Sequence, residues 1–119
     1  MPSWTTLPHQ NLIAYQVARE LVVVVREAKI TDSKLRDQAL RAATSACLNI
    51  AEAVGRVSAA DKARVYGIAR GEGCEAVAAV DIASAAGYCS AESLRAATLV
   101  GLRLYALLTA LSRRPTAAG

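Results

Sequence analysis

Four stretches of this sequence repeat apolar residues every three or four positions, and residues that end or cap helices separate each stretch from the next. This spacing is that of one face of an α-helix. Twenty-six of the 119 residues are Ala, the strongest helix former, and a run of strand-forming residues occurs only at 22–25. The pattern predicts an all-α chain with helices over about residues 10–29, 34–54, 59–86 and 91–112.

The apolar rows of three predicted helices show the period most clearly. The first row comprises Ile13, Val17, Leu21, Val24 and Ala28. The second alternates steps of four and three, as in packed helices, and comprises Ala39, Ala43, Ala46, Ile50, Ala53 and Val57. The row of the last helix comprises Leu94, Thr98, Gly101, Leu104, Leu108 and Leu111.

Short connections carry the expected helix boundaries. Gly55 marks the expected end of the second helix, and Gly87 is the expected left-handed C-cap of the third. Ser58 and Ser90 are the expected N-caps of the third and fourth helices. Since short connections make neighbouring helices antiparallel, we expect one domain over residues 1–119, an antiparallel up-down four-helix bundle with mobile tails at 1–8 and 115–119.

Several kinds of active site lack the residues that they need. The one histidine, His9, precedes the helical periods, where a solvated tail residue is expected, so neither a carboxylate–histidine metal site nor a catalytic dyad can be assembled. The run 71–73 lies inside a helical period and does not continue as a phosphate-binding loop. Three cysteines without a C-x-x-C pair predict free thiols that fill a core or an interface. We expect no enzyme, no cofactor and no metal.

The net charge of +4 is compatible with a phosphate-bearing partner and equally with an ordinary solvated surface. The N-terminal stretch lacks a basic segment followed by an apolar one, so it predicts no signal peptide. Charged residues interrupt every long apolar stretch, so no membrane span is expected. We therefore predict a cytoplasmic protein that has no contact with a membrane.

A polar row runs along the second predicted helix, beside its apolar row. It comprises Gln38, Arg41, Ser45, Asn49, Glu52 and Arg56. On a helix such a row flanks the core, where its members can pair along the same helix or reach a neighbouring one. The spacing alone is equally that of a solvated flank.

The residues of this region carry a family resemblance. Run 38–45 reads Gln-Ala-Leu-Arg-Ala-Ala-Thr-Ser and run 49–53 reads Asn-Ile-Ala-Glu-Ala, and Arg56 and Ser58 follow. These runs resemble the signature of the four-helix-bundle proteins encoded in bacterial ribosomal-RNA intervening sequences. That signature reads Gln-x-x-Arg-Arg-Ala-x-x-Ser, then Asn-Ile-Ala-Glu-Gly, then Arg-x-Ser.

Further matches extend the resemblance over about residues 12–111. They are Tyr15-Gln16 with Ala18, then Tyr66, Ala69-Arg70-Gly71, Glu75 and Gly87-Tyr88. The chain departs from the signature where Ala53 replaces a glycine and where Val77 replaces the second glutamate of a Glu-x-Glu pair. The family's usual Phe-Pro after the first helix is also missing.

The resemblance implies a cytoplasmic bacterial protein that forms homo-oligomers. Members of the family, and the similar accessory variability protein of diversity-generating retroelements, assemble as ring-shaped pentamers. RNA or another nucleic acid is the partner usually proposed for the family. The residues that match its motifs, and that we expect at or near subunit contacts, are Gln38, Arg41, Ser45, Asn49, Glu52, Arg56, Tyr66 and Glu75.

Two functions follow as hypotheses. In the first, the protein is a non-enzymatic oligomer that binds structured RNA, and its phosphate contacts come from Arg56, Lys62, Arg64 and Arg70. In the second, it is a structural or protein-interaction module with no direct role in nucleic-acid binding. A contiguous basic face favours the first hypothesis, and scattered, paired charges favour the second.

Self-association is predicted from the residues as well as from the resemblance. The first helix carries more apolar side chains than the three in seven that a core-facing bundle helix needs. One small bundle cannot bury them all, so part of the surplus should lie in an interface. The number of subunits, five, comes from the resemblance alone.

Overall fold

The computed structural model describes residues 5–113, which form an all-α fold with four α-helices and no strand among those residues. The helices are α1 (Ile13–Glu27), α2 (Ser33–Gly55), α3 (Ala59–Ala85) and α4 (Ala91–Leu111). A 3-10 helix, η2 (Pro8–Asn11), precedes α1. The prediction of an all-α chain with four helices is therefore confirmed.

The helix ends follow the predicted capping residues closely. The hydroxyls of Ser58 and Ser90 accept hydrogen bonds from the N–H groups of Asp61 and Ser93, in the first turns of α3 and α4, each at 3.0 Å. Asp32 does the same for α2, and its carboxylate accepts from the N–H of Leu35 at 3.0 Å. Gly87, after α3, has a φ of +83°, a left-handed conformation that glycine adopts without strain.

The start of α1 is the largest departure from the predicted boundaries. The helix was expected from residue 10, but η2 occupies residues 8–11, and its proline fixes a tighter turn before α1 begins. His9 in η2 is half-buried, and its ring lies edge-on to the ring of Tyr15, with 4.7 Å between the two ring centres. It is therefore not the solvated tail residue that we expected. The predicted tail at 115–119 and residues 1–4 of the other tail lie outside the described residues.

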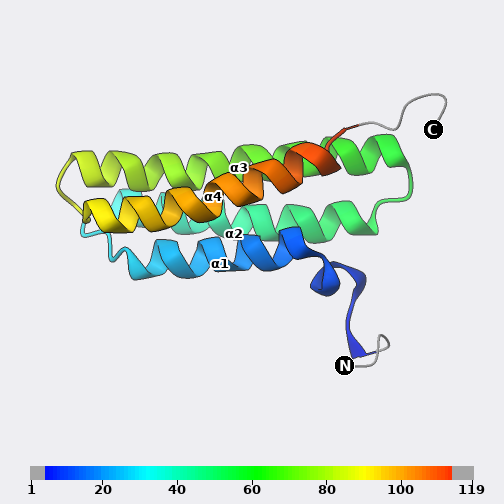
Figure 1. Cartoon of the computed structure of the whole chain (residues 1–119), viewed down its shortest axis with the longest axis horizontal. Helices are drawn as coiled ribbons and strands as arrows, with labels where there is room; N and C mark the ends of the chain where they lie inside the picture. Colours follow the sequence, from blue (N-terminus) through cyan, green and yellow to red (C-terminus); the bar gives the residue numbers. More distant parts are fainter. Residues whose placement is uncertain (1–4, 114–119) are drawn as a thin grey trace.

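The helices lie side by side along the length of the molecule, and short connections join them at its two ends (Figure 1). Each helix packs against two main neighbours, since α2 contacts α1 and α3, and α4 contacts α3 and α1. The N–H of Thr31, between α1 and α2, donates to the carbonyl of Tyr88, between α3 and α4, at 3.0 Å. This bond fixes those two connections together at one end.

The core is built mainly from small side chains on α2 and α3. The buried alanines of α2 are Ala39, Ala42, Ala43, Ala46 and Ala53, and those of α3 are Ala63, Ala69, Ala76, Ala79 and Ala83. Small residues let two helices approach closely, which increases the contact between their backbones. Larger apolar side chains fill the remaining space, and the largest that are fully buried include Leu21, Ile50, Leu104 and Leu108.

The members of the predicted apolar rows are buried or half-buried, except for two that are exposed. Val57 was expected to end the row of α2, but it follows the helix and is 98% exposed. Ile13 was expected in the core, but it stands in the first turn of α1 and is 53% exposed. Both residues match the helical period, but the core ends before it reaches them.

Candidate functional site

The polar row of α2 divides into three groups, each with different partners. At one end, Arg41 reaches α3, where its Nη2 lies 2.7 Å from Oε2 of Glu75 and its Nη1 lies 3.6 Å from Oε2 of Glu72. The hydrogen bond from Arg41 lowers the pKa of the Glu75 carboxyl group. Gln38, one turn before Arg41, is exposed. This end of the row joins α2 to α3.

In the middle of the row, the side-chain amide of Asn49 turns back along its own helix. Its Nδ2 donates to the carbonyl oxygen of Ser45 at 2.9 Å and to the hydroxyl oxygen of the same residue at 3.1 Å. Both residues are half-buried. Both bonds use the amide nitrogen, and the amide oxygen of Asn49 accepts no hydrogen bond among residues 5–113.

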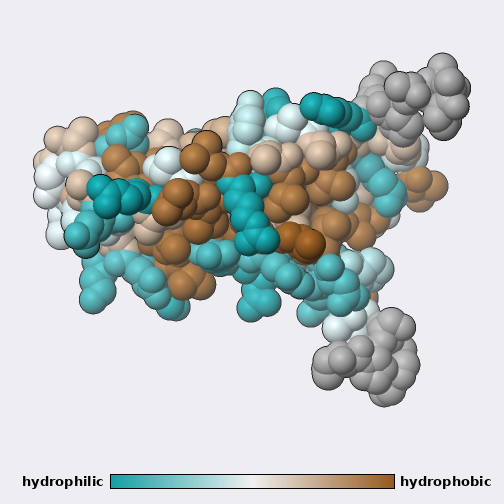
Figure 2. Space-filling model, viewed as in Figure 1, coloured by the Kyte–Doolittle hydropathy of each residue, from teal (hydrophilic) through white to brown (hydrophobic). Residues whose placement is uncertain are grey.

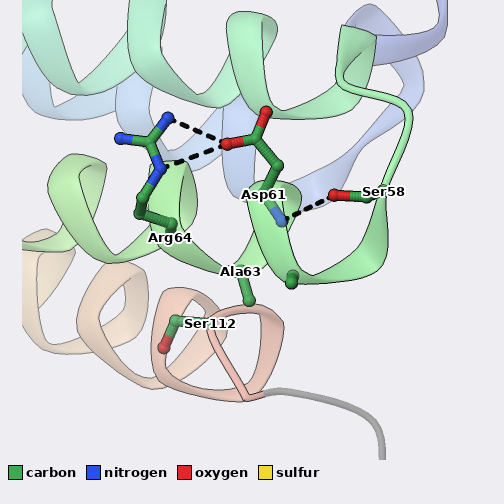
Figure 3. A pocket seen from close by; sticks show the side chains of 6 residues that line it. Ser58, Asp61, Ala63, Arg64 and Ser112 are labelled. Atoms are coloured by element: carbon green, nitrogen blue, oxygen red, sulfur yellow. Dashed lines mark hydrogen bonds and ion pairs between the residues drawn. The ribbon is translucent and has the colours of Figure 1, made fainter.

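The last group forms an ionic cluster at the connection between α2 and α3, which we call the corner cluster: Glu52, Arg56, Asp61 and Arg64. Arg56 contacts Glu52 and places its Nη1 3.3 Å from Oδ2 of Asp61. Arg64 donates two hydrogen bonds to the other carboxylate oxygen of Asp61, from Nη2 at 2.9 Å and from Nε at 3.1 Å (Figure 3). Two positive and two negative groups therefore neutralise each other.

The charges of the corner cluster stabilise each other's ionised forms. The hydrogen bond from Arg64 lowers the pKa of Asp61, and Arg56 lowers it further. The hydrogen bond to Glu52 raises the pKa of Arg56. Asp61, held in this way, stays ionised at neutral pH.

An open pocket of about 590 Å³ lies beside the corner cluster. Its lining residues are Ser58, Ala60, Asp61, Ala63, Arg64 and Ser112. Figure 3 shows that the pocket lies where the start of α3 meets the end of α4, and that Arg64 turns toward Asp61. The pocket therefore has polar walls but no excess of positive charge in its lining.

The other two predicted phosphate contacts are also engaged. Nζ of Lys62 donates to the carbonyl of Val54 at 3.0 Å, which satisfies a carbonyl in the last turn of α2. Arg70 lies apart from the corner, on the side of α3 that faces α4. Its guanidinium stands 5.0 Å from the ring centre of Tyr105, and its Nη1 donates to the hydroxyl of Thr109 at 3.2 Å. The four cations predicted to bind phosphate do not form one free basic row.

A feature that the sequence analysis missed is an apolar groove between α3 and α4. This α3–α4 groove, of about 310 Å³, is lined by side chains that include Val77, Thr98, Leu102 and Tyr105. Gly101 forms part of its floor, and a Cβ there would lie only 2.6 Å from Cγ2 of Val77. Leu102 is 62% exposed at its edge.

Apolar side chains continue from the groove over the outer face of α4, where Leu99 is 64% exposed. Figure 2 shows apolar side chains gathered along α4 in the middle of the molecule. The surplus was predicted on the first helix, where Ile13 and Val23 are 53% and 40% exposed, but the most exposed apolar side chains of the four helices include those of Leu99 and Leu102 on α4. The sequence contained a signal for this apolar surface, since Leu99 and Leu102 lie outside the predicted apolar row of the last helix.

A second apolar groove lies between α1 and α2. This α1–α2 groove, of about 340 Å³, is lined by residues that include Tyr15, Arg19, Val23 and Leu48. Leu48 is 65% exposed. Cys47 closes the bottom of the groove as a buried, free thiol, and burial raises its pKa.

A family model described as 23S rRNA-intervening sequence protein matches residues 10–109, most of the chain. The chain belongs to this family. A comparison with curated proteins gives no significant match. The match to the rRNA-intervening sequence family covers all four helices, the corner cluster and both grooves.

Within this member of the rRNA-intervening sequence family, the motif residues serve different purposes. Tyr66 is buried in the core of the chain, whereas Glu75 is half-exposed and paired with Arg41. Asn49 is half-buried beside the buried alanines of α2, and Glu52 is exposed. The family pattern therefore includes residues that hold the fold as well as residues on its surface.

The described residues offer no metal-ligating cluster and include one long apolar helix. Among residues 5–113, no group of three or more His, Cys, Asp or Glu side chains could hold a metal ion. One helix, α4, is long and apolar enough to cross a membrane by length and composition alone, and 17% of the relevant window is buried. The core helix of a soluble protein also meets this criterion of length and composition. Because little of α4 is buried, the finding mainly shows that its exposed surface is apolar.

Proposed function

We propose that this chain is a non-catalytic assembly module, an antiparallel up-down four-helix bundle that associates with further copies of itself. The observation that carries the proposal is the exposed apolar surface of α4 and its groove, where Leu99 and Leu102 each expose more than 60% of their surface. Exposed apolar surface of this extent, in contiguous patches, marks interaction sites on proteins. We propose that the assembly works in the cytoplasm.

The bundle topology is supported by the packing of each helix against its neighbours in sequence. It is supported equally by the hydrogen bond from Thr31 to Tyr88, which places two connections at one end. Short connections between adjacent helices favour the antiparallel up-down arrangement. In this arrangement each pair of neighbouring helices presents one side of the bundle to solvent.

Light scattering coupled to gel filtration tests self-association directly. At micromolar concentration we expect a discrete mass that is a multiple of the 12.5 kDa chain, and five copies if the family resemblance extends to the ring. A mass of one chain would overturn the assembly role. A discrete mass other than five copies would retain the assembly role and reject the pentamer.

RNA binding is a second candidate, and the family description, which refers to a sequence within 23S rRNA, favours it. Of the four cations predicted to contact phosphate, Arg64 lines the pocket at the corner cluster, and the half-buried Lys62 lies two residues before it on α3. Because the predicted phosphate contacts are engaged with carboxylates, carbonyls or a ring, the charge arrangement favours the assembly role. To contact RNA phosphates, some of these cations would have to leave their present partners within the chain.

Salt-dependent binding to RNA separates the two candidates. If Lys62 and Arg64 contact phosphates, the double variant Lys62→Gln, Arg64→Gln should reduce the slope of log affinity against log salt by roughly 0.7 to 0.9 for each lost contact. The matched control, Arg26→Gln with Lys34→Gln, removes the same charge from two other exposed positions. Equal effects of the two variants, or no binding by the wild type at low salt, would reject this RNA site.

A further inference from the structure

The α1–α2 groove has the composition of a small-molecule site. Its volume of about 340 Å³ falls within the range of about 300–1,000 Å³ that such sites occupy. Most of its lining is apolar or aromatic and comprises Tyr15, Val22, Val23 and Leu48. Sites of this kind add a few polar groups that orient the ligand, and in this groove they are the side chains of Arg19 and Thr44.

The groove has a buried floor, formed by Cys47, which is 7% exposed and carries a free thiol. Burial raises the pKa of this thiol, and the positive charge of Arg19 acts on it in the opposite direction with a smaller effect. The guanidinium of Arg19 therefore lies near enough to the floor to act on a group that is bound in the groove.

Arg19 has a free charge to offer to such a group. It is exposed, and none of the ion pairs within residues 5–113 involves it. Among the described residues it is also the one charged side chain of the groove lining. A guanidinium pairs with a carboxylate through two parallel hydrogen bonds. One cation neutralises one negative charge, so the groove suits a monocarboxylate better than a phosphate monoester, which carries about −1.5 to −2 charges at pH 7.

The positions of the lining residues along α1 limit the length of the ligand. Tyr15 and Val23 lie four residues before and after Arg19, which is about 6 Å along the helix on either side. A carboxylate held by Arg19 therefore leaves room for one ring or a short alkyl chain, whereas a long acyl chain would extend beyond the lining. The ring of Tyr15 favours an aromatic ligand, because aromatic rings pack on each other by face or edge.

We propose that the α1–α2 groove binds a small aromatic monocarboxylate, with the carboxylate paired to Arg19 and the ring packed against Tyr15 and Leu48. The hydroxyl of Thr44 supplies a further hydrogen-bond donor in the same lining. The site is independent of the proposed self-association. Since α2 packs against α1 and α3, and α4 packs against α3 and α1, this groove lies on the side of the bundle opposite the α3–α4 groove. A ligand there leaves the apolar surface of α4 free.

Two matched probes test the recognition of charge. They are 3-phenylpropanoate and the uncharged 3-phenylpropanamide, and ligand-observed NMR titrations at low ionic strength measure both affinities. A ligand of this size should bind in about the millimolar range. The acid should bind the wild type about three- to tenfold more tightly than the amide. Arg19→Gln should abolish this preference. Arg26→Gln should retain it, because Arg26 lies two turns later on α1, outside the groove lining.

Alkylation of Cys47 tests where the ligand binds. A background of Cys74→Ser and Cys89→Ser leaves Cys47 as the one thiol of the chain. With 3-phenylpropanoate at about ten times its Kd, alkylation by N-ethylmaleimide, followed by mass spectrometry, should slow about tenfold. At the same concentration of ligand, Arg19→Gln on this background should show protection of only about two- to fourfold.

A structural role of Arg19 would give a different pattern. Because Arg19 is exposed, Arg19→Gln and Arg19→Lys should both keep the helix content of the wild type in circular dichroism. Arg19→Lys retains the charge without the paired hydrogen bonds, so it should keep part of the preference for the acid.

Three results would overturn the proposal. Equal affinities of the wild type for the acid and the amide would reject the recognition of a carboxylate. Equal losses in Arg19→Gln and Arg26→Gln would reject Arg19 as its partner. A rate of Cys47 alkylation that the ligand leaves unchanged would reject the groove as the site. None of these results bears on self-association, which the mass of the wild type decides separately.

Discussion

The close approach of α3 and α4 at Gly101 leads to a quantitative prediction for Gly101→Ala. A Cβ at this position would lie 2.6 Å from Cγ2 of Val77, closer than real Cβ atoms come to a neighbour. Val77 is β-branched and has essentially one χ1 rotamer in a helix, so its methyl group cannot simply rotate away. Forcing an extra methyl group into such a contact costs about 1–3 kcal/mol.

The same substitution has a favourable effect that must be subtracted. Alanine is better than glycine inside a helix by about 0.8–1.0 kcal/mol. Gly101→Ala should therefore range from neutral to destabilising by about 2 kcal/mol. Gly71→Ala isolates the favourable part, because Gly71 is exposed inside α3 and a Cβ there would meet nothing within 4 Å. It should stabilise the protein by about 0.8–1.0 kcal/mol.

Urea unfolding followed by circular dichroism measures both variants against the wild type at one protein concentration. We expect Gly71→Ala to exceed Gly101→Ala in free energy of unfolding by about 1–3 kcal/mol, which is the cost of the contact with Val77. If the two variants were equally stabilised, α3 and α4 would not approach each other as closely as described here, and the reasoning would be refuted.

Three further predictions concern the core, a helix cap and acid stability. Leu21→Ala should lower the free energy of unfolding by about 2–5 kcal/mol because Leu21 is fully buried. Val57→Ala, at a residue that is 98% exposed and outside both grooves, should stay within about 0.5 kcal/mol; equal losses in urea titrations would contradict this burial. Ser90→Ala should cost about 0.5–2 kcal/mol by removing the N-cap of α4, and a thermal midpoint equal to that of the wild type would argue against the cap. Arg41 holds the pKa of the Glu75 carboxyl group below its ordinary value of 4.5. The ionised carboxylate therefore stabilises the folded state above that pH, and this stabilisation is lost as the pH falls through the lower pKa of the folded state. Arg41→Gln should flatten this part of the stability profile below about pH 5, and a profile parallel to that of the wild type would exclude the pair as its source.

The elements of the fold could be predicted from local chemistry because each signal depends on residues close together in the chain. Ser58 and Ser90 cap helices through bonds to N–H groups three residues away, and Gly87 ends one because it alone tolerates the required backbone. Periodicity, which is also a local signal, wrongly predicted that Ile13 and Val57 are buried. Their periodicity is that of the core, but burial depends on where neighbouring helices end.

The candidate site was predictable in its members but not in their arrangement. The polar row of α2 was found from spacing, whereas its partners Glu72 and Asp61 lie on another helix. The predicted phosphate contacts were found as cations, but the contacts of Arg56 with Glu52 and Asp61, and of Arg70 with Tyr105, became visible only with the helices in place. Charge in a sequence does not specify which charges remain free.

The sequence by itself determined that this chain is helical, where its helices end and which family it resembles, since periodicity, capping and motifs are properties of short stretches of chain. Only the tertiary structure decided that the surplus of apolar surface lies on α4, that α3 and α4 meet closely at Gly101, and that two grooves occupy opposite sides. Exposure and groove shape depend on contacts between residues far apart in the chain. The packing of α1 against both α2 and α4, for example, covers apolar residues whose pattern resembles that of the exposed ones on α4.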